Sequence, residues 1–351
     1  MFPPVDGSKL KRLLVVRTDR IGDVVLSTPV FQEIKKKYPE IYLAVLVSKE
    51  AEAVVTGNPW IDQVMVYDKT GREKGWRSNI RFIFKLRRQK FDAVIHLNPT
   101  RRIHLLTWFS GIGVRIGYDL KNRFALTHFL PETKQYGDRH EADCNFDLLT
   151  WIQVPRPSEF HLYFPLKEQD EARLRQIFPE RSRSYFVFHP SASCQSKIWP
   201  PERFAELADE LARKNGMLPV IIGEGMGQTH ARQMETAMKE PAVNLAGRLT
   251  LGMLAWLLKN AKLVISNDSG PVHVASAVGT PVISIFGRNR VGLNPNRWRP
   301  ISKSSSYVQK DVGCVECLGH QCRIDFLCLK ELSVAELIGE VKKYEPLLVS
   351  Q

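Results

Sequence analysis

Asp268, Ser269 and Gly270 stand where a predicted strand meets a predicted helix, and these residue types suit the binding of an anion. The strand is the apolar run 263–266, and the helix begins near Pro271, where the missing N–H costs nothing. Backbone N–H groups and the helix dipole at such a terminus favour a phosphate. Because ligands bind at this end of the strands in open α/β sheets, the segment predicts a phosphate-binding turn.

His273 falls on the first turn of the same predicted helix. It is either a buried histidine bonded to the backbone or a donor to a phosphate or ribose oxygen. The sequence supports both interpretations equally.

Asp23 follows Gly22 at another junction between a strand and a helix. One interpretation is that the carboxylate stabilises the helix start, an effect of about 0.3–1 kcal/mol through the dipole. The other is a general base that removes a proton from a substrate hydroxyl. Spacing alone does not decide between them.

Ser191, Ser193 and Lys197 share a loop between a predicted strand and a predicted helix. Hydroxyls and an ammonium group suit phosphate oxygens. A surface lysine with two turn serines is the plainer interpretation, and without further context it is the stronger one.

The glycines at 223, 225 and 227 follow a strand, as in dinucleotide-binding proteins, but they lack the GxGxxG spacing and a clear acidic partner about 20 residues further on. A nicotinamide enzyme is therefore disfavoured. The chain also contains no Asp-x-Asp pair, which many sugar-nucleotide enzymes use to hold Mg²⁺ or Mn²⁺. We therefore expect Lys197, helix N-termini and hydroxyls, rather than a metal, to neutralise a bound diphosphate.

Four of the six cysteines lie close together, at Cys314, Cys317, Cys322 and Cys328. A CxxC pair can hold one metal ion, but the second pair is spaced unlike a zinc ribbon. A structural metal is possible, and structural thiols or a crosslink are favoured over it.

Length and composition limit the class of protein. At 351 residues the chain predicts two domains, and its 44% hydrophobic and 25% charged residues are ordinary for a soluble globular protein. No apolar run reaches the roughly 18–20 residues of a transmembrane helix, and the N-terminus lacks the pattern of a signal peptide, so we expect a cytoplasmic location. The net charge of +13 points to an anionic partner, but no nucleic-acid motif accompanies it.

Two successive alternations of strands and helices would position these side chains. The first is predicted to contain strands at 11–17, 41–47, 63–67, 93–97 and 114–118, and helices at 24–38, 79–89 and 141–152. The second is predicted to contain strands at 185–189, 218–222, 263–266 and 282–286, and helices at 201–215, 228–239, 251–260 and 333–344. The pattern predicts an α/β protein of two doubly wound, Rossmann-like domains facing across a cleft, with the linker near the polar stretch 177–184.

Taken together, the motifs resemble the lipopolysaccharide heptosyltransferases of glycosyltransferase family 9. The resemblance runs in order over nearly the whole chain, on the segments 14–24, 189–193, 197–200, 266–273, 279–281 and 328–334. It implies a GT-B fold in which residues 1–178 bind the acceptor and residues 179–332 bind an ADP-sugar. It also implies that the C-terminal segment 333–351 packs back onto the first domain.

The resemblance further implies inverting, metal-independent transfer of a heptose from ADP-heptose to the inner core of lipopolysaccharide. Asp23 matches the family's general base. Lys197, with Ser191 and Ser193, matches the loop that holds the departing diphosphate. The donor-binding turn is matched by Asp268, Ser269, Gly270 and His273.

The remaining expectations concern the partners. Arg20, Arg101 and Arg102 are candidates for binding the phosphates or carboxylates of the acceptor. Either Glu224 or Gln228 would bind the donor's ribose, while Cys194 is unexpected in its loop. The enzyme would need no cofactor, act as a monomer, and work at the inner face of the inner membrane as a peripheral protein.

Three other functions compete with this one. They are a transferase using another nucleotide sugar for a different surface glycan, a GT-B UDP-sugar epimerase, and a non-catalytic anion-binding protein. The Gly22-Asp23 motif has no natural part in the epimerase, and binding without turnover would favour the last.

Overall fold

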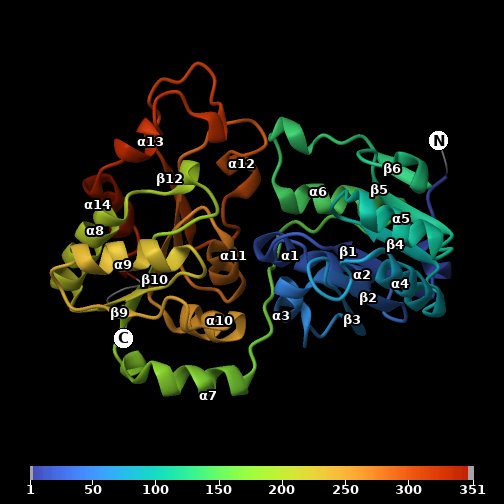
Figure 1. Ribbon diagram of the computed structural model, residues 1–351, viewed down its shortest axis with the longest axis horizontal. Coiled ribbons are helices and arrows are strands. Elements are labelled where there is room, and N and C mark those ends of the chain that lie inside the picture. The colour runs from blue at the N-terminus through green and yellow to red at the C-terminus, as the bar shows by residue number, and fades with distance from the viewer. Residues whose placement is uncertain (1–2, 347–351) are drawn as a thin grey trace. The chain divides into compact units, whose positions relative to one another are not determined.

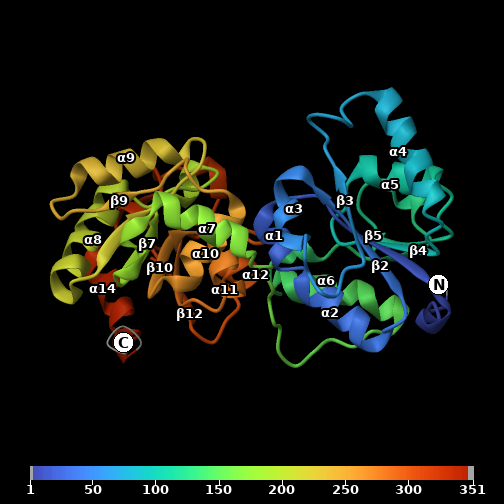
Figure 2. The same ribbon diagram turned by 90° about the horizontal axis from the view of Figure 1, so that it is seen from below.

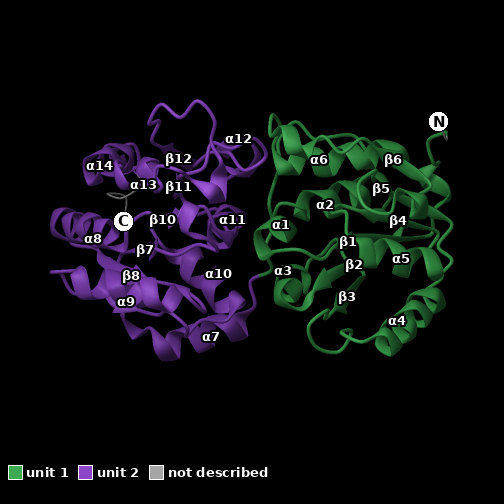
Figure 3. Ribbon diagram, turned by 45° about the horizontal axis from the view of Figure 1, so that its top comes forward, with its two compact units in different colours: residues 1–165 green, residues 166–351 purple. Residues whose placement is uncertain are grey.

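The computed structural model describes residues 3–346 and separates into two compact units, Met1–Pro165 and Leu166–Gln351 (Figures 1 and 3). Each unit has its own six-stranded sheet and its own helices (Figure 2). None of the helices among residues 3–346 combines the length and the apolar character that crossing a membrane would need.

Unit 1 is built on a parallel sheet in the order β3-β2-β1-β4-β5-β6. The strands are β1 (Arg12–Arg17), β2 (Tyr42–Ser48), β3 (Gln63–Tyr67), β4 (Ala93–His96), β5 (Val114–Tyr118) and β6 (His128–Leu130). The helices are α1 (Ile21–Val25), α2 (Thr28–Lys37), α3 (Glu52–Val55), α4 (Trp76–Arg88), α5 (Arg101–Phe109) and α6 (Glu141–Asp147). Short 3-10 turns are η1 (Gly7–Lys9), η2 (Lys49–Ala51), η3 (Arg123–Ala125), η4 (Lys134–Tyr136) and η5 (Leu148–Ile152).

The strands of unit 1 are continuous apolar runs because helices cover both faces of a parallel sheet. Residues 13–16 of β1 are fully buried. One face packs against Phe82 and Leu86 of α4 and Ile103 and Leu106 of α5.

The predicted helix at 24–38 is instead two helices. α1 ends at Val25 and α2 begins at Thr28, with Pro29 in its first turn. Pro29 has no N–H to continue a hydrogen-bond ladder, and the Thr28 hydroxyl donates to Val25 O at 2.7 Å. The break leaves Asp23 on a short helix of its own.

Unit 2 repeats the topology, with a parallel sheet in the order β12-β11-β10-β7-β8-β9. The strands are β7 (Tyr185–His189), β8 (Leu218–Ile221), β9 (Val243–Asn244), β10 (Leu263–Asn267), β11 (Val282–Phe286) and β12 (Ser305–Gln309). The helices are α7 (Glu168–Ile177), α8 (Pro201–Asn215), α9 (Gly227–Ala237), α10 (Leu251–Asn260), α11 (Gly270–Ala277), α12 (Pro295–Trp298), α13 (Leu327–Lys330) and α14 (Val334–Lys342). Short 3-10 turns are η6 (Pro179–Ser182), η7 (Gln195–Lys197) and η8 (Gly319–Gln321).

The ends of two helices in unit 2 follow from their sequence. α8 stops at Gly216, whose φ of 64° is left-handed and favours glycine. α14 begins with a capping box, in which Ser333 and Glu336 bond each other's backbone N–H.

The division of the chain falls earlier than the sequence suggests, between Pro165 and Leu166 rather than after residue 178. The reason is that α7 packs on α10, and Trp256 Nε1 donates to Lys167 O at 2.9 Å. At the other end, α14 packs on α8, and its Leu337 and Val341 lie in the core of unit 2 rather than in that of unit 1. The last part of the predicted segment, 347–351, lies outside the described residues.

Both sheets have a topological switch point, because successive strands proceed outward from the centre in opposite directions. In unit 1 it lies between β1 and β4, and in unit 2 between β7 and β10. In doubly wound sheets ligands bind at the carboxyl ends of the strands at this point. Asp23 follows β1 and Asp268 follows β10, so both predicted junctions lie where the topology favours a site.

Candidate functional site

Asp23 is held by a buried arginine that ends β1. Arg17 Nη2 donates to Asp23 Oδ1 at 2.9 Å, and the Arg17 side chain is 2% exposed against 12% for Asp23. The Ser27 hydroxyl donates to Asp23 O at 2.8 Å, which fixes the backbone of α1. The carboxylate therefore has a fixed orientation at the carboxyl edge of the sheet.

Arg17 also binds two further carboxylates and an amide. Its Nε donates to Asp19 Oδ1 at 2.8 Å, and its Nη1 donates to Glu141 Oε1 and Asn145 Oδ1, both at 3.0 Å. Glu141 in turn accepts from Lys134 Nζ at 2.7 Å. We call Arg17, Asp19, Asp23, Glu141 and Lys134 the arginine network. Its residues come from β1, the following turn, α1, η4 and α6.

Burial and charge compete in this network. Burial alone would lower the pKa of Arg17, but Asp19, Glu141 and Asp23 more than offset it, and the net shift is upward. Burial raises the pKa of Asp19 to about 6; Arg17 opposes the rise, while Asp23 and Glu141 add to it. Near pH 6 the network therefore gains or loses a proton.

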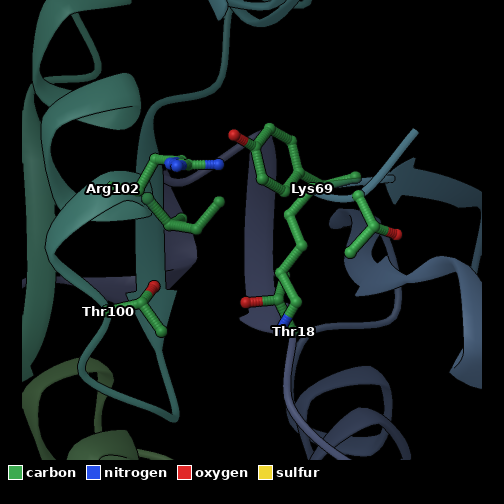
Figure 4. A pocket seen from close by; sticks show the side chains of 7 residues that line it. Thr18, Lys69, Thr100 and Arg102 are labelled. Carbon is green, nitrogen blue, oxygen red and sulfur yellow. The ribbon is translucent and has the colours of Figure 1, made fainter. Parts of the chain in front are cut away.

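A pocket with a volume of about 320 Å³ opens beside this turn, at the carboxyl ends of β1, β3 and β4. Its lining consists of Thr18, Tyr67, Lys69, Thr70, Thr100, Arg102 and Ile103. In Figure 4, Lys69 and Arg102 enter from opposite sides, with Thr18 and Thr100 below them. As far as residues 3–346 describe it, the lining has two cations and no carboxylate, which suits an anionic group.

Two further details favour a polar occupant of this pocket. The Thr100 hydroxyl is buried and has no hydrogen-bond partner within residues 3–346. Burial raises the pKa of Tyr67, a shift that its hydrogen bond to Arg102 opposes. Of the three predicted acceptor residues, only Arg102 lines this pocket; Arg20 and Arg101 are exposed at the starts of α1 and α5.

Unit 2 brings Lys197 and Asp268 together and adds Arg288. Lys197 Nζ lies 2.7 Å from Asp268 Oδ2 and also donates to Asp268 O at 3.1 Å. Arg288 Nη2 lies 3.0 Å from the same carboxylate oxygen. We call these three residues the lysine cluster. Two cations share one carboxylate, so one positive charge remains at the end of β10.

The N-terminus of α11 lies next to this cluster. Its N-cap, Ser269, makes no capping bond, because its hydroxyl interacts with His189 Nδ1 at 3.0 Å and with Asn267 O at 3.0 Å. Burial, with His230 adding to it, lowers the pKa of His189 to about 4, so this imidazole is neutral at pH 7. The first N–H groups of α11, from Gly270 onward, are therefore not capped by Ser269. His273 is buried on the same helix.

Ser191 belongs to the same edge of the sheet, while Ser193 is exposed further along the loop. The Ser191 hydroxyl lies 3.4 Å from His230 Nδ1, and a Cβ on Gly227 would come within 3.0 Å of it. A Cβ on Gly223 would approach Gly227 O to 2.6 Å, so the turn after β8 depends on glycine. Close backbone approach, rather than a dinucleotide fingerprint, accounts for this motif.

The two candidates for ribose binding differ in their surroundings. Glu224 is exposed in the turn after β8, whereas Gln228 is half-buried in α9 against Gly247. The choice between them stays a prediction.

The loop carrying Lys197 is anchored at several points. Trp199 N–H donates to Asn267 Oδ1 at 3.1 Å, and its buried indole donates to Leu332 O at 2.9 Å. The unexpected Cys194 only approaches the Ser196 hydroxyl, at 3.4 Å. Anchoring by Trp199 fixes the position of the lysine two residues earlier.

None of the six cysteines forms a disulfide, so the crosslink that we considered for the clustered four is not present. Burial raises the pKa of Cys328 to about 11, with Cys317, Cys322 and Cys314 adding to the shift. No group of three or more His, Cys, Asp or Glu side chains among residues 3–346 is arranged to hold a metal ion. A structural role for these thiols stays a prediction.

Sequence reasoning missed Arg17, Glu141, Arg288 and His189. Arg17 and His189 end apolar strands, and that position is itself a signal for the carboxyl edge of a sheet. Glu141 and Arg288 carry no such signal, because their partners are distant in sequence: Glu141 lies 124 residues from Arg17.

The model of one protein family matches residues 79–327 of this chain. Its description is glycosyltransferase family 9 (heptosyltransferase). Among curated proteins, the lipopolysaccharide core heptosyltransferase OpsX of Haemophilus influenzae is 27% identical over 85% of this chain and 84% of its own length.

Solved structures agree in fold. The family 9 glycosyl transferase from Veillonella parvula superposes with a TM-score of 0.84 at 24% identity, covering 99% of both chains. The Escherichia coli heptosyltransferase WaaC, solved with ADP, superposes with a TM-score of 0.73 at 19% identity over 95% of this chain and 99% of its own. The same enzyme has been solved with ADP-2-deoxy-2-fluoro heptose. These structures have the GT-B arrangement of two doubly wound sheets, and this chain shares their fold.

Proposed function

Because this chain belongs to glycosyltransferase family 9, the heptosyltransferases, we propose that it transfers a heptose from ADP-heptose to the inner core of lipopolysaccharide. The observation that carries this proposal is the pair of oppositely charged strand-end sites. The arginine network of unit 1 holds a carboxylate, and the lysine cluster of unit 2 holds a surplus positive charge. A transferase of this kind needs both a proton acceptor and a site for a departing diphosphate.

On the donor side, the proposed ligand is the diphosphate of ADP-heptose. Lys197 and the N–H groups that begin α11 would neutralise the charge that develops on the diphosphate as its bond to the sugar breaks. Asp268 would act by fixing Lys197 and Arg288 rather than by reacting. Ser191, Ser193, Ser269, Gly270 and His273 are the further donor-binding residues of the proposal, and Glu224 or Gln228 would bind the ribose.

On the acceptor side, Asp23 is the proposed general base. It would accept the proton of the acceptor hydroxyl as that oxygen forms the bond to the anomeric carbon and the ADP departs. A single displacement of this kind inverts the anomeric configuration. The bond from Arg17 fixes one Asp23 oxygen and leaves the carboxylate 12% exposed to receive a proton.

The pocket of unit 1 is the proposed site for a charged group of the acceptor. A phosphate or carboxylate there would face Lys69 and Arg102 and accept from the buried Thr100 hydroxyl. Arg20 and Arg101 remain proposed acceptor residues at the exposed rim of the same sheet edge.

The finer features of the proposal are metal-independent turnover without a cofactor, action as a monomer, and a cytoplasmic, peripheral position at the inner membrane. Lys197 and Arg288 supply the positive charge that a divalent ion would otherwise bring to the diphosphate. Transfer should therefore continue in EDTA, and a complete loss restored by Mg²⁺ would contradict metal independence.

A thermal-shift panel of ADP, UDP, GDP and CDP, followed by an assay of transfer from ADP-heptose, tests the proposal as a whole. We expect selective stabilisation by ADP and release of ADP only when an acceptor is added. Selective stabilisation by UDP would favour another nucleotide sugar. Tight binding of ADP-heptose without turnover on any acceptor would favour a non-catalytic binding protein.

A further inference from the structure

Helix α4 exposes a row of large apolar side chains. Trp76 is 69% exposed, Ile80 43% and Phe84 56%. Residues four apart lie on one face of a helix, so the three form a continuous stripe along α4. We call them the apolar stripe of α4.

The stripe is not needed for packing within the unit. The opposite face of α4 already supplies Phe82 and Leu86 to the core against β1, β2 and β3. α4 is therefore apolar on two faces, only one of which is covered. Contiguous exposed apolar side chains of this size mark an interaction surface.

The charged residues of α4 itself are all basic. α4 contains Arg77, Arg81, Lys85, Arg87 and Arg88, and none of its residues is acidic. At 100° per residue, Arg77, Arg81 and Arg88 follow directly beside the stripe on the helix surface. The guanidinium of Arg77 lies 5.2 Å from the centre of the Trp76 ring, so the tryptophan and the cation point to the same side.

The combination of an exposed apolar stripe with cations beside it favours a lipid surface over a protein as the partner of α4. Protein interfaces are depleted in charged groups at their core, although arginine is enriched in them, whereas five cations and no acidic residue occur in this helix of 13 residues. Helices that lie in the plane of a membrane have tryptophan, phenylalanine or leucine on one face and lysine or arginine on the other. Anionic headgroups complement such cations, each of which strengthens binding.

We propose that α4 docks unit 1 onto an anionic lipid surface. The apolar stripe enters the boundary between headgroups and acyl chains, and Arg77, Arg81 and Arg88 bind the lipid phosphates. Trp76 begins α4 a few residues after Lys69 of the acceptor pocket, and both lie at the carboxyl edge of the sheet. Docking through α4 therefore brings that edge to the membrane surface. The inference rests on the peripheral membrane position in the proposed function and deepens it by naming the surface, and lipid binding can be measured without donor or acceptor.

The test is co-sedimentation of the full-length protein with vesicles of phosphatidylcholine alone or mixed with phosphatidylglycerol, at low and high salt. The main variant is the double substitution Trp76→Ser and Phe84→Ser. A second variant, Arg77→Gln with Arg81→Gln and Arg88→Gln, removes charge and keeps the stripe. Phe109→Ser is the matched control, because Phe109 is 58% exposed and ends α5 in the same unit.

We expect the native chain to bind only the anionic vesicles, and less well at high salt. The serine double variant should partition at least about tenfold less, because two buried aromatic contacts are lost. The charge variant should lose its preference for phosphatidylglycerol, while Phe109→Ser should bind like the native chain. Circular dichroism must show each variant folded, which is expected because the stripe contributes nothing to the core.

Three results would overturn the proposal: equal vesicle binding by the native chain and the serine double variant, equal loss in Phe109→Ser, or a native dimer that the double variant converts to a monomer without lipid binding. The last result would make the stripe an interface between copies of the chain. Transfer to a water-soluble acceptor separates the two proposals. With this acceptor the serine double variant should keep the turnover of the native chain. A native chain that binds vesicles but transfers no sugar would refute only the proposed function.

Discussion

The arginine network and the lysine cluster both lie at the topological switch point of their unit, yet their charges are inverted. Arg17 ends β1 and is surrounded by the carboxylates of Asp19, Asp23 and Glu141. Asp268 follows β10 and is held by the cations of Lys197 and Arg288. Even with Lys134 included, the arginine network has one more carboxylate than cations, whereas the lysine cluster has one more cation than carboxylates.

This inversion shows how one topology serves two chemical tasks. A doubly wound sheet offers a loop and a helix start at its switch point, whatever the side chains are. A surplus of negative charge there favours taking up a proton, and a surplus of positive charge favours holding an anion. The topology of the sheet determines where a site lies, and the ratio of cations to carboxylates determines whether the site takes up a proton or binds an anion.

Replacing Asp23 should give the largest effect and tests the assignment of proton uptake to unit 1. We expect Asp23→Ala to lower the turnover number by roughly 10²–10⁴-fold, the usual contribution of a general base. Binding of ADP, measured by calorimetry, should stay within about twofold of native, since the proposed donor residues all lie in unit 2. A variant that keeps most of its turnover would end the assignment of Asp23 as the base.

Replacing Arg17 should chiefly damage stability, because the guanidinium compensates three carboxylates in a buried position. Arg17→Met is expected to cost roughly 3–5 kcal/mol in the free energy of unfolding, the usual penalty for breaking a buried ion pair. Urea unfolding followed by circular dichroism measures it.

Arg139→Met is the control for this experiment. Arg139 also binds a carboxylate, that of Asp147 at 2.6 Å, but its side chain is 43% exposed. A surface pair contributes about 1 kcal/mol or less. Equal losses of unfolding free energy in Arg17→Met and Arg139→Met would mean that Arg17 stabilises the fold no more than a surface ion pair does.

The contrast between the two regions also explains what the sequence can predict. β1 and β10 are continuous apolar runs, and the junctions after them contain Gly22-Asp23 and Asp268-Ser269-Gly270. Position along the chain was enough to identify these strand ends, and the family resemblance that the motifs carried is confirmed. These features can be predicted because each depends only on residues that are neighbours in the sequence.

Features that depend on distant partners were not predictable. A strand-ending arginine is usually solvated, whereas Arg17 is buried and bonds Glu141 and Asn145 of the distant helix α6. Arg288 looks like a surface residue until β10 and β11 place it beside Asp268. Similarly, the polar stretch 177–184 suggested a linker there, while the packing of α7 on α10 places the division of the chain before α7.

Replacing Lys197 tests whether the lysine cluster of unit 2 binds the diphosphate of the donor. Lys197→Ala removes one charge-assisted contact, worth about 1.5–3 kcal/mol, so we expect kcat/KM for the donor to fall roughly 10–100-fold. ADP should also bind more weakly. Lys214→Ala is the control, because this lysine of unit 2 pairs with Glu345 at the surface, where it is 54% exposed. Unchanged donor kinetics in Lys197→Ala would remove the residue from the site.

The smallest expected effect is the pH dependence of stability that comes from Asp19. Burial holds its pKa at about 6 in the folded protein, above the value of about 3.9 for an unfolded chain. The folded state therefore binds the extra proton between these values, and its stability falls as the pH rises through that interval. Because the Asp19 side chain is 28% exposed, solvent screening limits the effect to on the order of 1–2 kcal/mol.

Asp19→Asn removes this titration and leaves the guanidinium two carboxylates. The melting temperature of the variant, relative to the native chain, should therefore rise from pH 4 to pH 6 and then stay level. A difference that is constant across this range would mean that Asp19 is ionised throughout, and that Arg17 rather than burial controls its pKa. In that case the arginine network would hold all three carboxylates charged at once, and the inversion of charge between the two units would persist to pH 4.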